Sequence, residues 1–403
     1  MHVAALEWLT FGLARAVTAA VERGLTLHLL TSDRTEYAFG LRRSAPGSLV
    51  IHDVDTSDPT CVAKELRAID GLAGLISTTD VCSLVSLEVA AELGLAAQPS
   101  DAVRLVRDKG ALRRYLYMMG LSRASQVTVD PFAADVLAAT GMLTYPAVLK
   151  DASGTGSEGV WIAQGPDDVP GILDAARTGR LRGGVLTAEP YFSGPLYSAE
   201  TLSWDGETRL LGISSRLLSP LPHFREEGEA FPVAFPEPQA AELAGWISSV
   251  LNGIAYRGFS HTEFIITDDG YEIVEINPRL GGGMIGELIC DAYETNIYEA
   301  FFDMALGRRP ALLDAPLVAV RGMAEVDLMA DRTGVFDGFD GEDRLAGHPG
   351  SPRLCSARSH GETVDSLTDW RGSLGSIVAE GPTAELAMHN AAAAARLVRP
   401  RVI

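Results

Sequence analysis

The sequence predicts a multidomain protein of mixed α/β and α+β class, with a parallel-sheet domain first and a small lid domain last. Residues 1–100 alternate short strand patterns with helix patterns, as is typical of a parallel sheet covered by helices. Two short runs rich in β-forming residues lie within 262–276 and predict a hairpin. After residue 310 the chain changes to short strands separated by glycine-containing turns, which indicates an α+β segment.

We divide the 403 residues into three expected domains. Residues 1–100 form an N-terminal α/β domain. Residues 101–310 form the central region, in which 146–190 is a flexible lid subdomain, and residues 311–403 form the C-terminal α+β domain. The expected helices are 13–21, 85–93, 239–251 and 383–397, and the expected strands of the first domain are 25–30, 48–52 and 71–77.

The composition argues against several classes of function. A formal net charge of −20 disfavours nucleic acid and anionic membranes as partners. The four cysteines lie far apart without a Cys-x-x-Cys pair, so neither a zinc site nor a disulfide framework is indicated. No GxGxxG follows an early strand, which argues against a Rossmann dehydrogenase. Without a basic leader or a run of about 20 apolar residues, we expect a cytoplasmic protein.

The hairpin is expected to gather acidic side chains on one face. Residues 268–270 (DDG) fit a three-residue loop, which pairs Thr267 with Tyr271 and sets Glu263 opposite Glu275. Side chains that face each other across antiparallel strands have Cβ atoms about 5 Å apart. Because side chains alternate along a strand, the same count sets His261 opposite Asn277 and points four apolar side chains into a core: Phe264, Ile266, Val274 and Ile276.

Glu263, Glu275 and Asn277 are therefore predicted metal ligands. Facing carboxylates repel each other, and hard oxygen ligands at this spacing suit Mg²⁺, which takes one or two carboxylates and leaves its other positions to water and phosphates. Mn²⁺ is the alternative metal. Arg279 and the glycines 281–283 follow directly and suit an anion clamp in a loop that a ligand can approach closely. An exposed hairpin with scattered acids is the competing interpretation.

Lysine is rare in this chain. Of 33 basic residues only Lys64, Lys109 and Lys150 are lysines, and a lysine kept against this bias indicates a need for a compact ammonium charge. Lys109 is expected in the middle of a helix, and Lys150 at the end of a strand before a glycine-rich loop at 151–159. Its glycines can turn backbone N–H groups toward an anion; they are Gly154, Gly156 and Gly159, with Ser153 and Ser157 between them. A surface lysine and an ordinary turn are the alternatives.

Glu189-Pro190-Tyr191-Phe192 follows a predicted strand. The Pro190 carbonyl and the Phe192 N–H would supply the acceptor and donor that a purine edge requires, and the Glu189 carboxylate a second acceptor. A plain loop is the alternative. Residues 219–236, rich in proline, are expected to form a loop that reaches over a pocket.

In this order, a lysine on a helix, PAVLK with a glycine loop, EPYF and EINPRLGGG resemble the ATP-grasp superfamily. The likeness is to its carboxylate–amine ligases, such as the L-amino-acid (dipeptide) ligases, and more distantly to biotin-carboxylase-like enzymes. It implies ATP bound through its phosphates by Lys109, Lys150 and the loop around Ser157, and through its adenine by Glu189, Pro190 and Phe192. It implies Mg²⁺ on Glu263, Glu275 and Asn277, and Arg279 as the catalytic residue.

The resemblance implies an ADP-forming ligase. A small carboxylate, expected to be an amino acid, would be activated as an acyl phosphate and joined to an amine, and a homodimer is left open. Two positions depart from the family pattern: Glu229 replaces a histidine of the substrate loop FVExGHxxP, and Leu196 replaces a ribose-binding glutamate. The alternatives are an ATP-dependent carboxylase of the biotin-carboxylase or purine-pathway type and a non-catalytic nucleotide-binding regulator.

Overall fold

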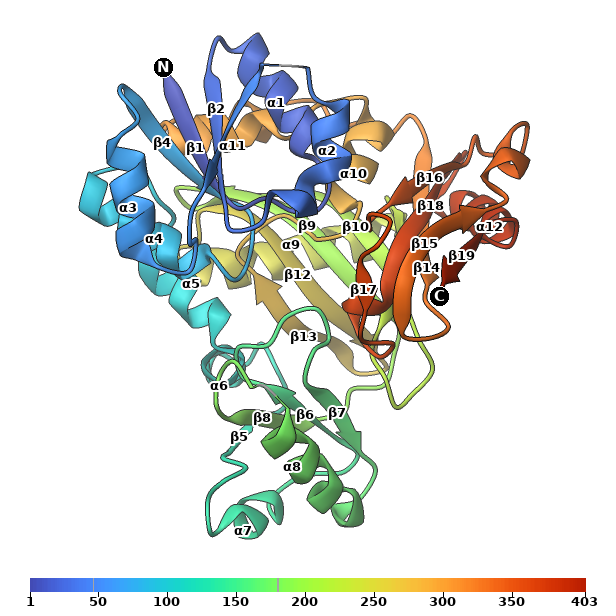
Figure 1. The fold of residues 1–403 in the computed structure, drawn as a ribbon. Coiled ribbons are helices and arrows are strands. Elements are labelled where there is room, and N and C mark those ends of the chain that lie inside the picture. Colours follow the sequence, from blue (N-terminus) through green and yellow to red (C-terminus); the bar gives the residue numbers. More distant parts are fainter. Residues whose placement is uncertain (46, 180) are drawn as a thin grey trace.

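A computed structural model describes residues 1–45, 47–179 and 181–403 (Figure 1). Within these ranges the chain forms four sheets of four, eight, three and four strands. The long sheet runs through the centre, with the N-terminal sheet at the top of the view, the small sheet with α7 and α8 at the bottom and the C-terminal segment at the right. No helix in these ranges is long and apolar enough to cross a membrane.

The N-terminal sheet is parallel, as predicted, with the order β3-β2-β1-β4. Its first strand was not expected from the sequence, although it supplies a row of buried apolar side chains. Gly94 ends α4 in the left-handed conformation with φ of 67°, which glycine adopts without steric cost. The elements are β1 (His2–Leu6), α1 (Leu13–Glu22), β2 (Thr26–Thr31), α2 (Ala38–Arg43), β3 (Leu49–Asp53), α3 (Pro59–Arg67), β4 (Leu72–Ser77) and α4 (Ser83–Leu93).

The next segment enters a small antiparallel sheet with the order β5-β8-β6-β7. The helix expected around Lys109 is in fact two helices, because Asp108 is extended and its Oδ1 accepts a hydrogen bond from Ala111 N at 2.8 Å. Lys109 therefore begins α6 instead of lying in mid-helix. The elements are α5 (Ser100–Arg107), α6 (Lys109–Met118), β5 (Val127–Val129), α7 (Val136–Thr140), β6 (Ala147–Asp151), β7 (Val160–Ala163), α8 (Val169–Thr178) and β8 (Leu186–Pro190).

The long sheet is antiparallel, with the order β13-β12-β9-β10-β11-β14-β18-β16. It joins the central region to the C-terminal segment through the pairing of β11 with β14. The loop expected at 219–236 is wrong for 226–231, which form β11 because the strand pairs on both sides. The strands are β9 (Leu196–Trp204), β10 (Glu207–Leu218), β11 (Glu226–Phe231), β12 (Gly258–Thr267), β13 (Gly270–Asn277), β14 (Gly322–Met329), β16 (Arg353–Ser356) and β18 (Ser373–Gly381).

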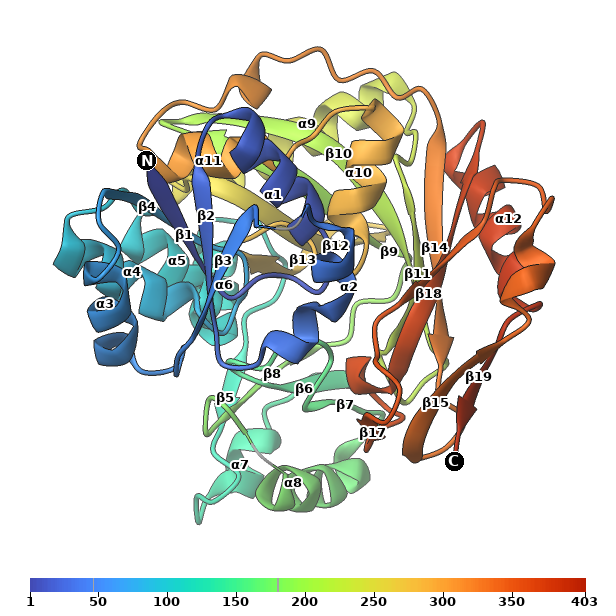
Figure 2. The same cartoon turned by 45° about the horizontal axis from the view of Figure 1, so that its top comes forward.

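Helices and a three-stranded sheet complete the molecule. Figure 2 shows α12 on the outer side of β14 and β18, where its alanines pack against alanines of both strands and of β11. The order of the three-stranded sheet is β17-β15-β19. The remaining elements are α9 (Glu237–Gly253), α10 (Ile285–Tyr293), α11 (Glu299–Ala305), β15 (Gly334–Asp340), β17 (Thr363–Val364), α12 (Ala384–Ala395) and β19 (Arg399–Val402).

The hairpin register differs from the prediction in a way that preserves its site. Thr267 pairs with Gly270 and not with Tyr271, so the loop has one residue fewer than expected. An irregularity in the pairing then sets Phe264 opposite Ile273, and beyond it Glu263 faces Glu275 as predicted. Because the extra residue reverses the alternation, Val274 lines a cavity and Ile273 enters the core. The expectation that Val274 points into the core is therefore wrong.

Thr383 caps α12 with its side chain, which accepts a hydrogen bond from Leu386 N at 3.3 Å. Replacing it by alanine leaves a helix-terminal N–H without this partner, and we expect the free energy of unfolding to fall by about 1 kcal/mol. Urea denaturation measures the change. Thr383→Ser keeps the hydroxyl and is the control; equal losses in both variants would contradict the capping role.

Candidate active site

A cavity of about 670 Å³ lies between the long sheet and the small sheet and is also lined by residues of the N- and C-terminal segments. It gathers all the predicted site residues except Asn277. Asn277 is buried beside it and donates from Nδ2 to Glu275 Oε1 at 2.9 Å. Side chains that are far apart in the sequence thus meet around one space.

Lys109 joins two parts of this site. Its Nζ lies 2.6 Å from Glu275 Oε2 and donates a hydrogen bond to the Gly154 carbonyl at 2.7 Å. Burial favours the neutral form of Glu275, but the charge of Lys109 outweighs it and holds the pKa of this carboxyl well below its usual range. Glu275 is therefore ionised and can serve as a hard oxygen ligand.

Lys150 is buried and pairs with Glu189, and its Nζ also donates to the Val274 carbonyl at 3.2 Å. Arg113 contacts the other Glu189 oxygen, with Nε 2.8 Å from Oε2. Burial opposes the charge on Glu189, yet Arg113 and Lys150 together hold its pKa below the ordinary value. Both oxygens of Glu189 are thus engaged with cations, while Pro190 and Phe192 line the same cavity.

The three predicted metal ligands offer two carboxylates and an amide. Glu263 and Glu275 face each other across the hairpin and are partly exposed toward the cavity, with 19% and 18% of their side-chain surfaces accessible. Within the described ranges no group of three or more His, Cys, Asp and Glu side chains could hold a metal ion. The donor set still fits Mg²⁺, which binds through few carboxylates when phosphates supply further oxygens.

His261 contacts the carboxylates of Glu200 and Glu263. Its Nδ1 lies 2.5 Å from Glu200 Oε1 and its Nε2 lies 3.2 Å from Glu263 Oε1. The ring is buried, as is Glu200, whose second oxygen accepts from Gly281 N at 3.1 Å. His261 therefore orients Glu263 and links the hairpin to the glycine loop.

Arg279 is anchored by the N-terminal segment. Its Nε donates to Asp80 Oδ2 at 2.6 Å and its Nη1 donates to the Leu280 carbonyl at 2.9 Å. Arg107 lies 3.3 Å from the other Asp80 oxygen. Asp80, which no sequence pattern singled out, fixes the direction of a guanidinium that lines the main cavity.

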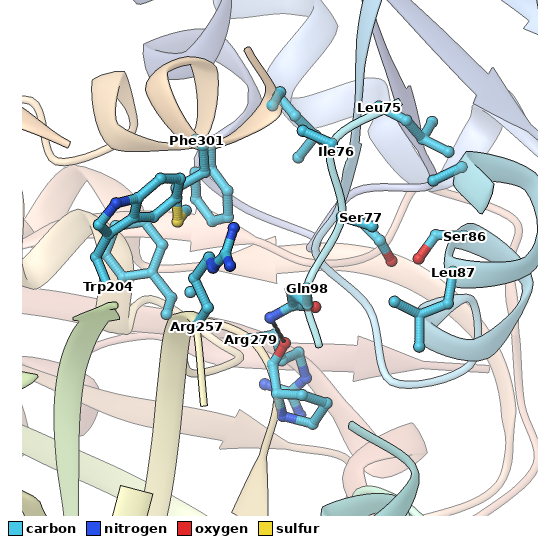
Figure 3. Close-up of a pocket in the computed structure, with 18 residues that line it drawn as sticks. Leu75, Ile76, Ser77, Ser86, Leu87, Gln98, Trp204, Arg257, Arg279 and Phe301 are labelled. Carbon is cyan, nitrogen blue, oxygen red and sulfur yellow. Dashed lines mark hydrogen bonds between the residues drawn. The ribbon is translucent and has the colours of Figure 1, made fainter. Parts of the chain in front are cut away.

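Arg279 also borders a second, smaller cavity of about 70 Å³ (Figure 3). Its walls are mostly apolar, and Gln98 donates there to the Pro278 carbonyl at 3.2 Å. Among the described residues that line it there is no carboxylate, which distinguishes it from the main cavity. The larger cavity is the one that acidic side chains line.

The glycine-rich loop is closed over the main cavity. Ser157 donates from Oγ to the Phe224 carbonyl at 2.7 Å, and Gly156 lies against Trp370 of the C-terminal segment. Gly156 and Ser157 both have φ of 62°. The loop therefore rests on two other parts of the chain, in a backbone conformation that favours glycine.

Gly156→Ala is expected to obstruct this closed position. A Cβ at Gly156 would lie 2.4 Å from the Trp370 ring, in open conflict with it. Because a loop held away from its ligands positions them poorly, we expect kcat/KM for the nucleotide substrate to fall about 10-fold.

Gly24→Ala is the matched control for the loop prediction, because Gly24 has φ of 65° and no atom within 4 Å of a built Cβ. Steady-state kinetics compares the two variants, and Trp370→Ala added to Gly156→Ala should restore part of the activity. Unchanged kinetics in Gly156→Ala would contradict the contact.

A row of charged side chains on the cavity wall was largely missed. Arg216 on β10 pairs in register with Glu229 on β11, and Glu229 pairs with Glu325 on β14. Asp327 lies two residues further along β14 and also lines the cavity. We call these four residues, three acids and one arginine, the acidic row. The alternation of Glu325 and Asp327 along one strand was a signal for a shared face, but nothing in the sequence indicated its partners.

The chain has the ATP-grasp fold. Residues 129–283 match the model of the ATP-grasp domain, and residues 328–402 match that of the L-amino acid ligase C-terminal domain 2. The chain therefore combines an ATP-grasp domain with the C-terminal domain of L-amino acid ligases. The resemblance expected from the sequence is confirmed.

The relatives agree with this assignment. The chain is 26% identical to carnosine synthase 1 of Mus musculus over 73% of its own length and 38% of the relative's. It is 24% identical to the L-arginine-specific L-amino acid ligase of Bacillus subtilis, over 68% of this chain and 67% of that one. The crystal structure of an L-amino acid ligase from Bacillus licheniformis has the same fold, with a TM-score of 0.83, 17% identity and coverage of 100% and 98% of the two chains.

Proposed function

We propose that the protein is an ATP-dependent ligase that joins a small carboxylate, an amino acid, to an amine, with release of ADP and phosphate. The observation that carries the proposal is the meeting of Lys109, Lys150, Glu263, Glu275 and Arg279 around one cavity. Lysines suit phosphates, paired carboxylates suit Mg²⁺, and a fixed guanidinium suits a transferred phosphoryl group. The names of the relatives point to the same class of reaction.

ATP would lie between the two sheets. Lys109 and Lys150 would contact its α- and β-phosphates, and the loop with Gly154, Gly156 and Ser157 would cover the β/γ-phosphates. Pro190 and Phe192 line the cavity beside Glu189 and would hold the adenine through backbone groups. Leu196, where relatives have a ribose-binding glutamate, also lines the cavity, so the ribose would meet an apolar wall there.

The divalent metal would be held by Glu263, Glu275 and Asn277. When bound, Mg²⁺ supplies charge neutralisation at the phosphate oxygens and so lowers the barrier to phosphoryl transfer. Glu275 is already ionised, and Asn277 and His261 hold the two carboxylates in place. The donor types of these three residues thus suit the ion.

The chemistry would proceed in two transfers. A substrate carboxylate oxygen attacks the γ-phosphorus of ATP, the bond to ADP breaks, and an acyl phosphate forms. The amine nitrogen then attacks the acyl carbon, phosphate leaves, and the nitrogen loses a proton to give the amide. Arg279, fixed by Asp80, would offset the charge on the transferred group in both steps. The closed loop would keep water from the acyl phosphate.

The test is ADP and phosphate release from Mg-ATP by the full chain with pairs of amino acids, with amines alone, and with bicarbonate in a separate arm. Release that requires both a carboxylate and an amine, with an amide product found by mass spectrometry, supports the ligase. A requirement for bicarbonate would assign a carboxylase instead. Nucleotide binding without turnover in any arm would assign a regulator. The cytoplasm, where ATP and Mg²⁺ are at hand, is the proposed location.

A further inference from the structure

The acidic row lies in the part of the cavity that the nucleotide and metal residues leave free. Arg216, Glu229 and Glu325 are register partners on three adjacent strands, so their side chains lie side by side on one face. Glu229 and Glu325 are buried, at 4% and 5% accessibility. Two carboxylates opposite each other destabilise a sheet, and burial makes an unpaired charge more costly.

Within the described ranges, Arg216 is the cation that forms an ion pair with an acid of this row. Arg216 contacts both Glu226 and Glu229, with its Nη1 2.6 Å from Glu229 Oε2. Glu325 and Asp327 take part in no ion pair within the described ranges. Glu325 Oε1 accepts a hydrogen bond from the Met284 N–H at 3.1 Å, and Asp327 Oδ1 accepts from the hydroxyls of Ser373 and Ser376 at 3.0 and 3.1 Å.

Two oxygens of the row have no hydrogen-bond donor. Glu229 Oε1 and Glu325 Oε2 are buried without a partner among the residues that the structure describes, and both side chains line the cavity. Buried polar groups are normally satisfied. Burial, and for Glu325 and Asp327 a neighbouring carboxylate, raise the pKa of Glu229 to about 7, that of Asp327 to about 7 and that of Glu325 well above its ordinary value. Glu229 and Glu325 therefore each present to the cavity a buried oxygen that has no donor among the described residues.

The row lies close to the proposed catalytic centre. A Cβ at Gly283 would lie 2.8 Å from Glu325 Oε1, and one at Gly282 would lie 3.8 Å from Arg279 Nη1. The glycine loop therefore separates Arg279 from the row by little more than its own backbone. A small molecule whose carboxylate reacts near Arg279 can reach Glu325 and Asp327 with its other end.

We infer that one substrate is a basic amino acid, whose side-chain ammonium or guanidinium is held by Glu229, Glu325 and Asp327. The inference rests on the proposed ligase function and adds the class of substrate. The row presents three acid side chains to the cavity, and its one arginine is shared with Glu226. A single α-ammonium would therefore leave acceptor oxygens of the row without a donor. A neutral side chain there would leave buried carboxylates without a partner, which costs binding free energy.

Isothermal titration tests the inference on the full chain with a non-hydrolysable ATP analogue and Mg²⁺ present. L-lysine is compared with L-norleucine, and L-arginine with L-citrulline, because each pair shares the α-ammonium and differs in side-chain charge. We expect the cationic member to bind at least ~10-fold more tightly. In Glu325→Gln and Asp327→Asn this ratio should fall toward one. Asp331→Asn, an exposed acid just beyond β14, is the control and should keep it.

ADP formation with the same amino acids separates this inference from the proposed function. Cation-selective binding without turnover on any amine would refute the ligase and keep the cation site. Turnover of norleucine and citrulline as efficient as that of lysine and arginine would refute the basic substrate and keep the ligase. Absence of binding by all four amino acids would overturn the inference, as would a wild-type lysine preference in both β14 variants.

Discussion

Glu275→Gln is expected to lower kcat about 10³-fold while the protein stays folded. Glutamine keeps the size of the side chain and an oxygen that Asn277 can still donate to. It removes the negative charge that pairs with Lys109 at 2.6 Å and that the metal requires as a hard anionic ligand. The loss therefore falls on charge stabilisation in the transition state, for which the variant offers no substitute.

Amine-dependent ADP formation over a range of Mg²⁺ concentrations measures this effect. The Mg²⁺ concentration for half-maximal rate should rise together with the fall in kcat, whereas a purely structural role would lower the amount of folded protein and leave that concentration unchanged. Circular dichroism checks the fold. Glu88→Gln, an exposed acid on α4, is the control. A Glu275→Gln variant with near wild-type kcat would remove Glu275 from the metal set.

The pairing of Glu263 with Glu275 was predicted correctly, although the predicted loop length and the predicted alternation of side chains were partly wrong. The sequence signals a glycine turn and alternating strands, and these limit the register to a few choices. The loop is one residue shorter than expected, and an irregularity beside Phe264 restores the count. No glycine marks that position, so the sequence carried no sign of it. Val274 changed faces as a result, whereas the carboxylates beyond the irregularity kept theirs.

The acidic row shows what one sequence cannot supply. Glu325 and Asp327 alternate visibly, but their neighbours Glu229 and Arg216 come from strands about a hundred residues earlier. Which strands are adjacent depends on the closure of the whole sheet, and local pattern does not encode it. The contact between Asp80 and Arg279 could not be predicted for the same reason, because the two residues belong to different segments of the chain. Lys150 and the glycine-rich loop could be selected from the sequence because the rarity of lysine and the spacing of the glycines are visible within one short segment.

The two lysines of the site differ in what they would lose on truncation. Lys109 pairs with Glu275, which also accepts a hydrogen bond from Asn277. Lys150, in contrast, is one of two cations among the described residues that pair with the buried Glu189. Removing Lys150 would therefore remove a proposed phosphate contact. It would also take away one of the two positive charges that pair with Glu189 in the cavity wall. The effect on nucleotide binding is separable, because Arg113 remains to pair with Glu189.

Lys150→Ala is expected to weaken binding of the ATP analogue about 100-fold, since the loss of a buried charge contact typically costs 2–5 kcal/mol, or roughly 30-fold and more. Isothermal titration measures the affinity, and thermal unfolding reports the accompanying loss of stability. Lys64→Ala is the matched control because Lys64 is exposed on α3 and is the remaining lysine of the chain. Wild-type affinity in a folded Lys150→Ala protein would mean that Lys150 does not contact the phosphates. It would also count against phosphate binding by the loop at 153–159. Weakened binding in this variant but not in Lys64→Ala would assign the lysine kept at the end of β6 to the nucleotide.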